Sequence, residues 1–120
     1  MKGAYCLLVH VSKSSKIKIG SLGIIHFDQG YYIYVGSAMN NLESRVRRHF
    51  ITAEKKFCKL RWHIDYLLMA PGVKIIRVYE FASKNKTECT IAHVLAQRYE
   101  LVSRFGSSDC KCGSHLFKVK

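Results

Sequence analysis

The chain has 120 residues, of which 48% are hydrophobic, and this length and composition suit one folded domain spanning residues 1–120. Lys and Arg outnumber Asp and Glu by 20 to 8, so the formal net charge is +12. The hydrophobic content excludes a disordered chain, and the lack of any apolar run of about 18 residues excludes a membrane-spanning helix. The charge favours a polyanionic partner, which we expect to be nucleic acid rather than a membrane.

The five cysteines are odd in number and irregularly spaced, which does not fit a disulfide framework. We therefore expect thiols in a reducing, cytoplasmic compartment. The apolar run from Ala4 to Val11 follows Lys2, as in a short export signal, but no small-residue cleavage site comes after it. We interpret the run as a strand.

The first third of the chain predicts an antiparallel β-meander. Residues 3–10 are apolar on both alternating faces, as in the central strand of a sheet. Gly20-Ser21 predicts a tight turn, and Asp28-Gln29-Gly30 predicts a second one. The strands around these turns are expected at 16–19, 22–27 and 31–36.

The pattern then changes to a helical period. Asn40 or Asn41 can cap a helix, and Glu43 lies at the capping-box position relative to Asn40. One face of this helix carries apolar or aromatic residues and one histidine: Leu42, Val46, His49 and Phe50. A second, short helix is expected at 62–69, where Pro71 stops it.

The remaining chain predicts a strand at 73–81 and a last helix from Lys86 to about Ser103, capped by Asn85 with Glu88 at the box position. A turn-rich segment at 106–112 and a final strand at 115–120 follow. The fold class is α+β, a small antiparallel or mixed sheet with helices packed on it and an extra N-terminal hairpin.

Several short motifs, in order, carry a resemblance to a known family. They are Gly3-Ala4-Tyr5, Tyr34-Val35-Gly36-Ser37-Ala38, the Arg45–Phe50 helix segment, Trp62-His63-Ile64-Asp65-Tyr66-Leu67-Leu68, and residues 106–116. Together they resemble the GIY-YIG nuclease superfamily, and more closely a microbial subfamily of it that also occurs fused to endonuclease III-like repair enzymes. Two departures are Ala4 in place of Ile and the 29 positions between Tyr5 and Tyr34, which we assign to the extra hairpin.

The resemblance implies a role for each matching residue. Tyr5 and Tyr34 match the motif tyrosines that activate the attacking water, and Arg45 matches the arginine that holds the scissile phosphate. His49 matches a histidine of some homing nucleases. Glu88 is the match for the carboxylate that binds Mg²⁺ or Mn²⁺, with Glu80 as its rival. Gly36 and His63 are expected to support the site.

The residue types suit that chemistry. A guanidinium binds phosphate oxygens in pairs, which lysine cannot do. Arg45 and His49, four positions apart, share one helix face. One carboxylate can suffice for Mg²⁺, which keeps waters and phosphate oxygens as ligands. A tyrosine is a poor base at neutral pH, so Tyr5 or Tyr34 needs help from Arg45 or the metal.

The segment from Ser37 to Trp62 is strongly basic and predicts a track for nucleic-acid phosphates. Its expected contact residues are Ser37, Arg47, Arg48, Lys55, Lys56, Lys59 and Arg61. The alternative is an ordinary solvated basic surface.

Structural alternatives stand beside each functional assignment. The tyrosines can be half-buried strand residues, His49 a core histidine, and Glu88 only a helix cap. His63 and Asp65 are two positions apart, so a dyad on one helix face is not expected. The tail motif Cys110-x-Cys112-x-x-His115 can hold zinc, but its spacing is tighter than in zinc fingers, and we favour a tail docked on the sheet.

The sequence thus predicts a metal-dependent DNA endonuclease of the GIY-YIG type that works in DNA repair or processing, with RNA as an alternative substrate and a repair protein as a further partner. The alternative is a module that binds nucleic acid without cleaving it, or an interaction domain of a repair complex.

Overall fold

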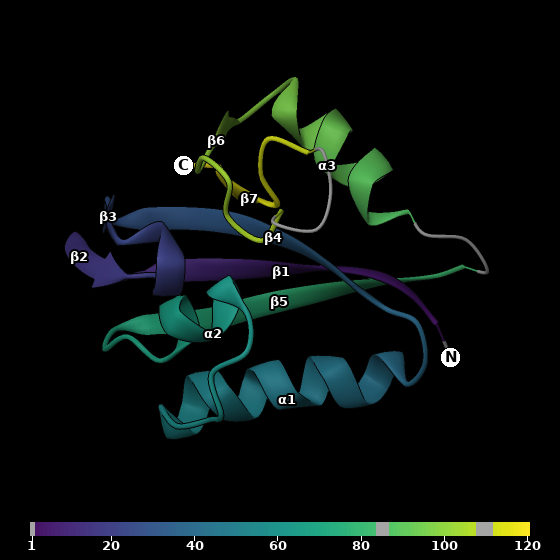
Figure 1. Ribbon diagram of the computed structural model, residues 1–120, viewed down its shortest axis with the longest axis horizontal. Helices are drawn as coiled ribbons and strands as arrows, with labels where there is room; N and C mark the ends of the chain where they lie inside the picture. Colours follow the sequence, from purple (N-terminus) through teal and green to yellow (C-terminus); the bar gives the residue numbers. More distant parts are fainter. Residues whose placement is uncertain (1, 84–86, 108–111) are drawn as a thin grey trace.

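A five-stranded antiparallel sheet forms the centre of the protein in a computed structural model, which describes residues 2–83, 87–107 and 112–120 (Figure 1). The strand order is β5-β1-β4-β7-β6, so β1 lies between two partners, as its two apolar faces predict. The bounds are β1 Gly3–Val11, β4 Gly30–Ala38, β5 Val73–Ala82, β6 Glu100–Leu101 and β7 Leu116–Lys118. With three helices on this sheet, the predicted α+β class is confirmed.

The predicted hairpin forms, but it lies outside the main sheet. Strands β2 (Ser15–Lys18) and β3 (Ile24–Phe27) pair only with each other, and a 3₁₀ turn at Gly20–Leu22 joins them. The expected meander is therefore wrong, because β1 pairs directly with β4 along its whole length. The hairpin is held against the core by Ile19 and Phe27, both fully buried.

Helices α1 (Leu42–Lys55) and α2 (His63–Leu68) contribute to one core cluster with the β1 side chains Tyr5 and Leu7. Asn41 is the cap of α1, since its Oδ1 accepts from the Ser44 backbone N–H at 3.0 Å. The alternative cap, Asn40 with Glu43, is not the one used. Phe50, predicted on the inward face, is 38% exposed, because the inward positions of this part of the helix are filled by His49, Thr52 and Ala53.

Helix α3 (Glu88–Ala96) belongs to a second core cluster, built on the sheet side chains Cys6, Val35 and Phe117. The helix ends at Ala96, not near Ser103, because Tyr99 packs into that cluster and Glu100–Leu101 pairs with β7. The predicted cap Asn85 and start Lys86 lie outside the described residues. Figure 1 places α1 and α3 on opposite sides of the sheet strands.

The C-terminal segment docks on the sheet, as expected. The His115 N–H donates to the Phe105 carbonyl and the Val35 N–H donates to the His115 carbonyl, both at 2.8 Å. The final strand is shorter than predicted, covering Leu116–Lys118. Part of the predicted turn-rich tail, residues 108–111, lies outside the described residues. Among the helices described, none has the length and apolar character needed to cross a membrane.

Candidate functional site

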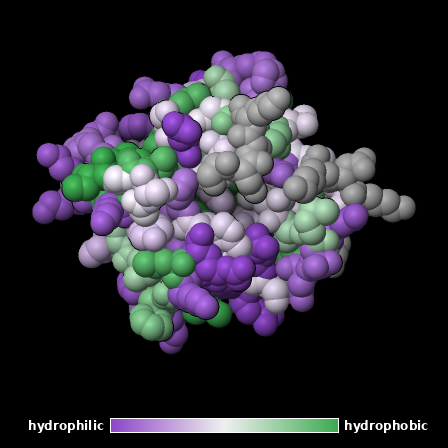
Figure 2. All heavy atoms as spheres, viewed as in Figure 1, coloured by the Kyte–Doolittle hydropathy of each residue, from purple (hydrophilic) through white to green (hydrophobic). Residues whose placement is uncertain are grey.

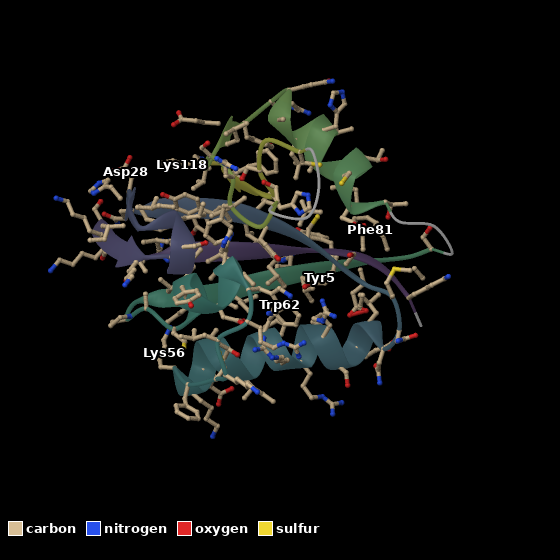
Figure 3. The ribbon with its side chains drawn as sticks, in the orientation of Figure 1. Tyr5, Asp28, Lys56, Trp62, Phe81 and Lys118 are labelled. Carbon is tan, nitrogen blue, oxygen red and sulfur yellow. The ribbon has the colours of Figure 1, made fainter. Side chains whose placement is uncertain are left out.

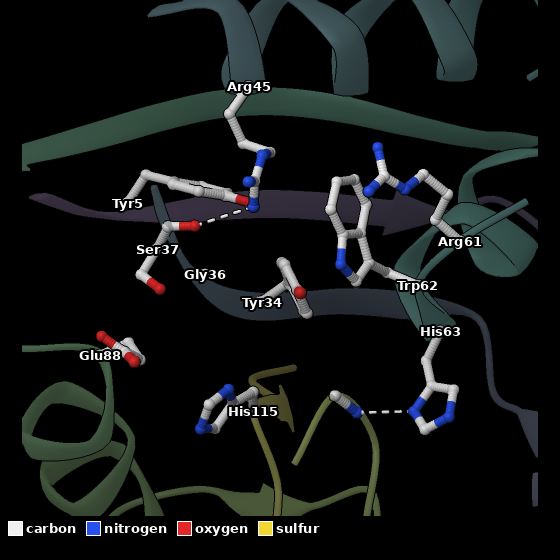
Figure 4. Close-up of a pocket in the computed structure, with 11 residues that line it drawn as sticks. Tyr5, Tyr34, Gly36, Ser37, Arg45, Arg61, Trp62, His63, Glu88 and His115 are labelled. Carbon is white, nitrogen blue, oxygen red and sulfur yellow. Dashed lines mark hydrogen bonds between the residues drawn. The ribbon is translucent and has the colours of Figure 1, made fainter. Parts of the chain in front are cut away.

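A pocket of about 220 Å³ gathers residues from β1, β4, α1, α2, α3 and the C-terminal segment (Figure 4). Eight of its lining residues were predicted to belong to a site: Tyr5, Tyr34, Gly36, Ser37, Arg45, Arg61, His63 and Glu88. Three more were not predicted to line it: Trp62, Gly106 and His115. In Figure 4, Arg45 and Arg61 lie on one side of the pocket and Glu88 and His115 on the other.

The two motif tyrosines come together because their strands are neighbours. Tyr5 on β1 pairs with Gly36 on β4, and Tyr34 pairs with Leu7, so both tyrosines lie on one face as diagonal neighbours. Their ring centroids are 6.4 Å apart. The hairpin β2–β3 accounts for the long separation in sequence.

Gly36 lets the Tyr5 ring lie flat across β4. A Cβ at this position would be 2.4 Å from both Cζ and Oη of Tyr5, far inside normal contact distance. The glycine is therefore required by side-chain packing. This gives the predicted supporting role of Gly36 a physical basis.

His49 lies behind Tyr5, away from the pocket surface. It is fully buried, and its Nε2 is 2.6 Å from the Tyr5 hydroxyl. Burial, with a smaller contribution from the Arg48 and Arg45 charges, lowers the pKa of His49 to about 4, so the imidazole is neutral at pH 7. Burial likewise raises the pKa of Tyr5, although the nearby Arg45 charge works against this. Both groups of the pair are thus neutral.

Arginines surround Trp62 at the pocket wall. The guanidinium carbons of Arg45, Arg48 and Arg61 lie 4.4, 4.7 and 5.0 Å from the Trp62 ring centroid. Such contacts stabilise the cations against the π face of the ring. Arg45 is also fixed by donating from Nη1 to the Ser37 carbonyl at 2.9 Å. Trp62 belongs to the quoted 62–68 motif, but that motif gave no signal that its ring would order arginines.

Arg48 is engaged in a structural ion pair with Asp65. Its two terminal nitrogens donate to the two Asp65 oxygens at 2.7 and 3.1 Å. Asp65 is fully buried and also accepts from the Arg61 and Trp62 backbone N–H groups, which caps α2. Burial would raise the pKa of Asp65, but the Arg48 hydrogen bond and the two N–H groups hold it below its usual value.

Among the described residues, Glu88 is the carboxylate that lines the pocket. It begins α3, is only 9% exposed, and its Oε2 has no hydrogen-bond partner among the described residues. A buried carboxylate oxygen of this kind requires a ligand, a water or a proton. The rival Glu80 is exposed on β5 and does not line the pocket. The capping alternative with Asn85 falls on residues outside those described.

Besides Arg48, which pairs with Asp65, the predicted phosphate track divides into three groups. Ser37 and Arg61 line the pocket, whereas Arg47, Lys55 and Lys59 are exposed on or after α1. Lys56 is turned inward, where its ammonium donates to the Leu68 and Val73 carbonyls at 3.0 and 2.6 Å. Figure 3 places Lys56 at the C-terminal end of α1, away from Tyr5 and Trp62. In Figure 2, hydrophilic side chains gather over the middle of the α1 half of the displayed face, and hydrophobic side chains lie to their left.

His63 supports the pocket from α2. Its Nδ1 accepts from the Gly106 backbone N–H at 2.8 Å, so it fixes the segment that forms the lower wall in Figure 4. Burial lowers the pKa of His63 and favours the neutral ring that this acceptor role needs. The spacing did not favour a His63–Asp65 dyad, and the two residues have different partners: His63 accepts from Gly106, and Asp65 accepts from Arg48.

Beside the pocket, Cys89, Cys112 and His115 bring their ligand atoms within 4.8 Å of one another. The sequence motif placed Cys110 in this set, but Cys110 lies outside the described residues. The additional partner is Cys89 on α3, which is distant in sequence and offered no spacing signal. This cluster, and not one containing Glu88, is the group of three potential metal ligands found among the described residues.

The chain belongs to a protein family described as Domain of unknown function DUF123, whose profile matches residues 4–120. That description names no activity and no link to another superfamily. Searches of curated proteins and of solved structures gave no match.

Proposed function

We propose that the protein is a metal-dependent DNA endonuclease of the GIY-YIG type. The observation that carries this proposal is the convergence of Tyr5, Tyr34, Arg45 and Glu88 in one pocket from four different elements. The quoted motifs contain Tyr5, Tyr34 and Arg45, and the resemblance offered Glu88 as the match for the metal-binding carboxylate, with Glu80 as its rival. The net charge of +12 supports a nucleic acid as the substrate.

Arg45 and Arg61 supply the phosphate-binding groups. Arg45 donates from Nη1 to the Ser37 carbonyl, which fixes its guanidinium at the pocket wall beside Tyr5. Arg61 is exposed and lines the pocket, where it can bind the phosphates of a nucleic-acid strand that approaches from solvent. Guanidinium groups can bind two phosphate oxygens at once and stay charged at any relevant pH.

Tyr5 and His49 form a proton path for the attacking water. Tyr5 is neutral, so it cannot act alone as a tyrosinate base. It can accept the proton of water while passing its own to His49 Nε2, 2.6 Å away. Burial is the largest factor that disfavours the resulting imidazolium, and the Arg48 and Arg45 charges add to it. The Asp65 carboxylate and the negative phosphate diester work in the opposite direction and favour the imidazolium. His49 therefore acts through Tyr5, without touching the phosphate.

Glu88 fits the role of the Mg²⁺ or Mn²⁺ ligand. Its unpartnered, buried Oε2 is a hard oxygen donor at the pocket wall opposite Arg45. A divalent ion held there supplies electrostatic stabilisation of the charge that develops on the phosphate. We thus propose that Glu88 alone supplies the protein's carboxylate ligand to this ion.

A second candidate is a module that binds nucleic acid without cleaving it. One observation favours it: burial raises the pKa of Tyr5, so the group proposed to activate water is held neutral. Such a module would keep the basic surface and the pocket arginines. It would bind DNA with strong salt dependence but yield no product.

A cleavage assay tests the proposal. Plasmid, duplex, single-stranded and branched DNA, with an RNA duplex added, are incubated with the protein in Mg²⁺ or Mn²⁺. We expect metal-dependent products that fall about 100-fold or more in Arg45→Ala. Arg47→Ala, which removes an exposed arginine of the same helix, should stay within a few-fold of wild type.

Equal cleavage by wild type and Arg45→Ala would contradict the proposal and indicate a contaminant or another site. No cleavage of any substrate, with DNA binding retained, would replace it with the non-cleaving module. Both variants need the wild-type circular dichroism spectrum for the comparison to hold.

A further inference from the structure

We propose that Cys89, Cys112 and His115 form a binding site for Zn²⁺, distinct from the Glu88 site. Their ligand atoms all lie within 4.8 Å of one another, and Cys89 Sγ is 4.0 Å from His115 Nε2. Cys89 comes from the first turn of α3, Cys112 from the segment before β7, and His115 from the residue that precedes β7. Three separate parts of the chain therefore converge on one point.

The spacing suits tetrahedral zinc. Zn–S bonds of about 2.3 Å and Zn–N bonds of about 2.05 Å place ligand atoms roughly 3.6–3.8 Å apart. The observed 4.0 Å between Cys89 Sγ and His115 Nε2 is within a few tenths of an ångström of this. Other separations in the group reach up to 4.8 Å, about 1 Å beyond the tetrahedral value, and side-chain rotations of the two half-buried cysteines can close this difference.

The surroundings hold the ligands in place. His115 is 6% exposed, and backbone hydrogen bonds tie it to Phe105 and to Val35 on β4. On the other side, Ala92 of α3 packs in the cluster that contains Val35 and Phe117. Cys89 on a packed helix and His115 in a segment that is hydrogen-bonded to the sheet need little reorganisation to bind an ion.

The donor set selects a different metal from the one proposed for the pocket. Two thiolates and an imidazole prefer Zn²⁺, whereas Mg²⁺ and Mn²⁺ prefer oxygen ligands such as Glu88. Three protein ligands leave one coordination position for water or another donor. The protein would therefore carry two chemically distinct metal sites side by side.

Zinc at this position would fix one wall of the pocket. Cys89 follows Glu88 directly in sequence, and His115 both lines the pocket and belongs to the ligand set. An ion that joins Cys89 to His115 ties the start of α3 to β7. This consequence concerns the placement of Glu88 and does not depend on whether the protein cleaves DNA.

The test uses the full chain, purified under reducing conditions, stripped with a chelator and titrated with Zn²⁺ and with Co²⁺. We expect one ion per chain, and for Co²⁺ the charge-transfer absorption of thiolate coordination. Cys89→Ser and Cys112→Ser should each weaken Zn²⁺ binding at least 100-fold. Cys58→Ser, which changes a half-buried thiol beside Met69, should bind like wild type. Zn²⁺ should also slow amide exchange in the first turn of α3.

Three results would overturn the proposal. They are no stoichiometric Zn²⁺ binding by wild type, unchanged Zn²⁺ binding in both Cys89→Ser and Cys112→Ser, and a Cys89–Cys112 disulfide that persists after purification under reducing conditions. If a variant fails to fold, the wild-type stoichiometry and Co²⁺ spectrum still decide. Cleavage of DNA without zinc would leave the proposed function intact, and zinc binding without cleavage would leave this site intact.

Discussion

Replacing Gly36 by alanine tests whether the Tyr5 ring is locked across β4. The new Cβ would stand 2.4 Å from Cζ and Oη of Tyr5, about 1 Å inside an ordinary contact of roughly 3.4 Å. The ring cannot withdraw freely, because it is buried and its hydroxyl is bonded to His49. Since the Gly36 backbone is not in the left-handed region, the collision is the main source of the effect.

The magnitude follows from two contributions. Overpacking of a filled core costs about 2 kcal/mol, and a displaced Tyr5–His49 hydrogen bond adds about 1 kcal/mol. A domain of this length has an unfolding entropy near 0.25 kcal/mol per kelvin, so a total of about 3 kcal/mol lowers the Tm by about 12 °C.

Urea unfolding followed by the fluorescence of Trp62, the one tryptophan of the chain, measures the free energy of unfolding. Gly113→Ala is the matched control, because among the described residues its Cβ would meet the flexible end of Leu101, at 3.2 Å. Tyr5→Leu removes the colliding ring atoms. In that background Gly36→Ala should cost less than about 0.5 kcal/mol. An unchanged cost there would refute the packing argument.

Three further results are expected. The pKa of His49 is about 6.5 in the unfolded chain and about 4 in the folded protein. About 3 kcal/mol of folding stability that is present above pH 6.5 should therefore be lost as the pH falls toward 4. Urea unfolding of His49→Gln should show a flatter pH dependence of stability over this range. Asp65→Asn should lower the free energy of unfolding by about 3 kcal/mol, because it removes the buried partner of Arg48; a loss below about 1 kcal/mol would contradict that role. Arg61→Gln should reduce the slope of log affinity for DNA against log salt by about one, whereas Lys56→Gln should leave the slope unchanged because its ammonium is bound to backbone carbonyls; equal effects would remove the distinction.

Local pattern was sufficient to predict most elements of this fold. Two apolar faces identified β1, the β-rich run after the second turn identified β4, and alternation identified β5. The 3.6-residue period, with Asn40 or Asn41 as the cap, identified α1. The pairing of β1 with β4 could not be predicted, because nothing local shows that the hairpin between them leaves the sheet. The early end of α3 was missed for a similar reason, since pairing of Glu100–Leu101 with β7 overrides a helical pattern.

The candidate site was predicted in part. The motif residues Tyr5, Tyr34 and Arg45 were named from the resemblance, and Glu88 was named beside its rival Glu80. The fold brings Tyr5, Tyr34, Arg45 and Glu88 together and leaves Glu80 out of the pocket. The contacts that determine their chemistry depend on tertiary structure. The sequence did not reveal that His49 would face Tyr5 and not a phosphate.

Other partners were equally invisible in the sequence. Arg48 looked like its exposed neighbour Arg47, yet it pairs with a buried Asp65 17 positions away. Cys89 reaches His115 only because α3 packs on the sheet beside β7. In both cases the decisive neighbour is distant in sequence, so no spacing rule could find it.

The most direct test of the proposed nuclease compares Glu88→Gln with Glu80→Gln. Single-turnover DNA cleavage is measured while Mn²⁺ is varied from zero to saturation. The account predicts that Glu88→Gln loses at least 100-fold in rate and its saturable Mn²⁺ response. Glu80→Gln, which changes an exposed residue outside the pocket, should behave like wild type. Unchanged cleavage by Glu88→Gln, or a loss confined to Glu80→Gln, would contradict it.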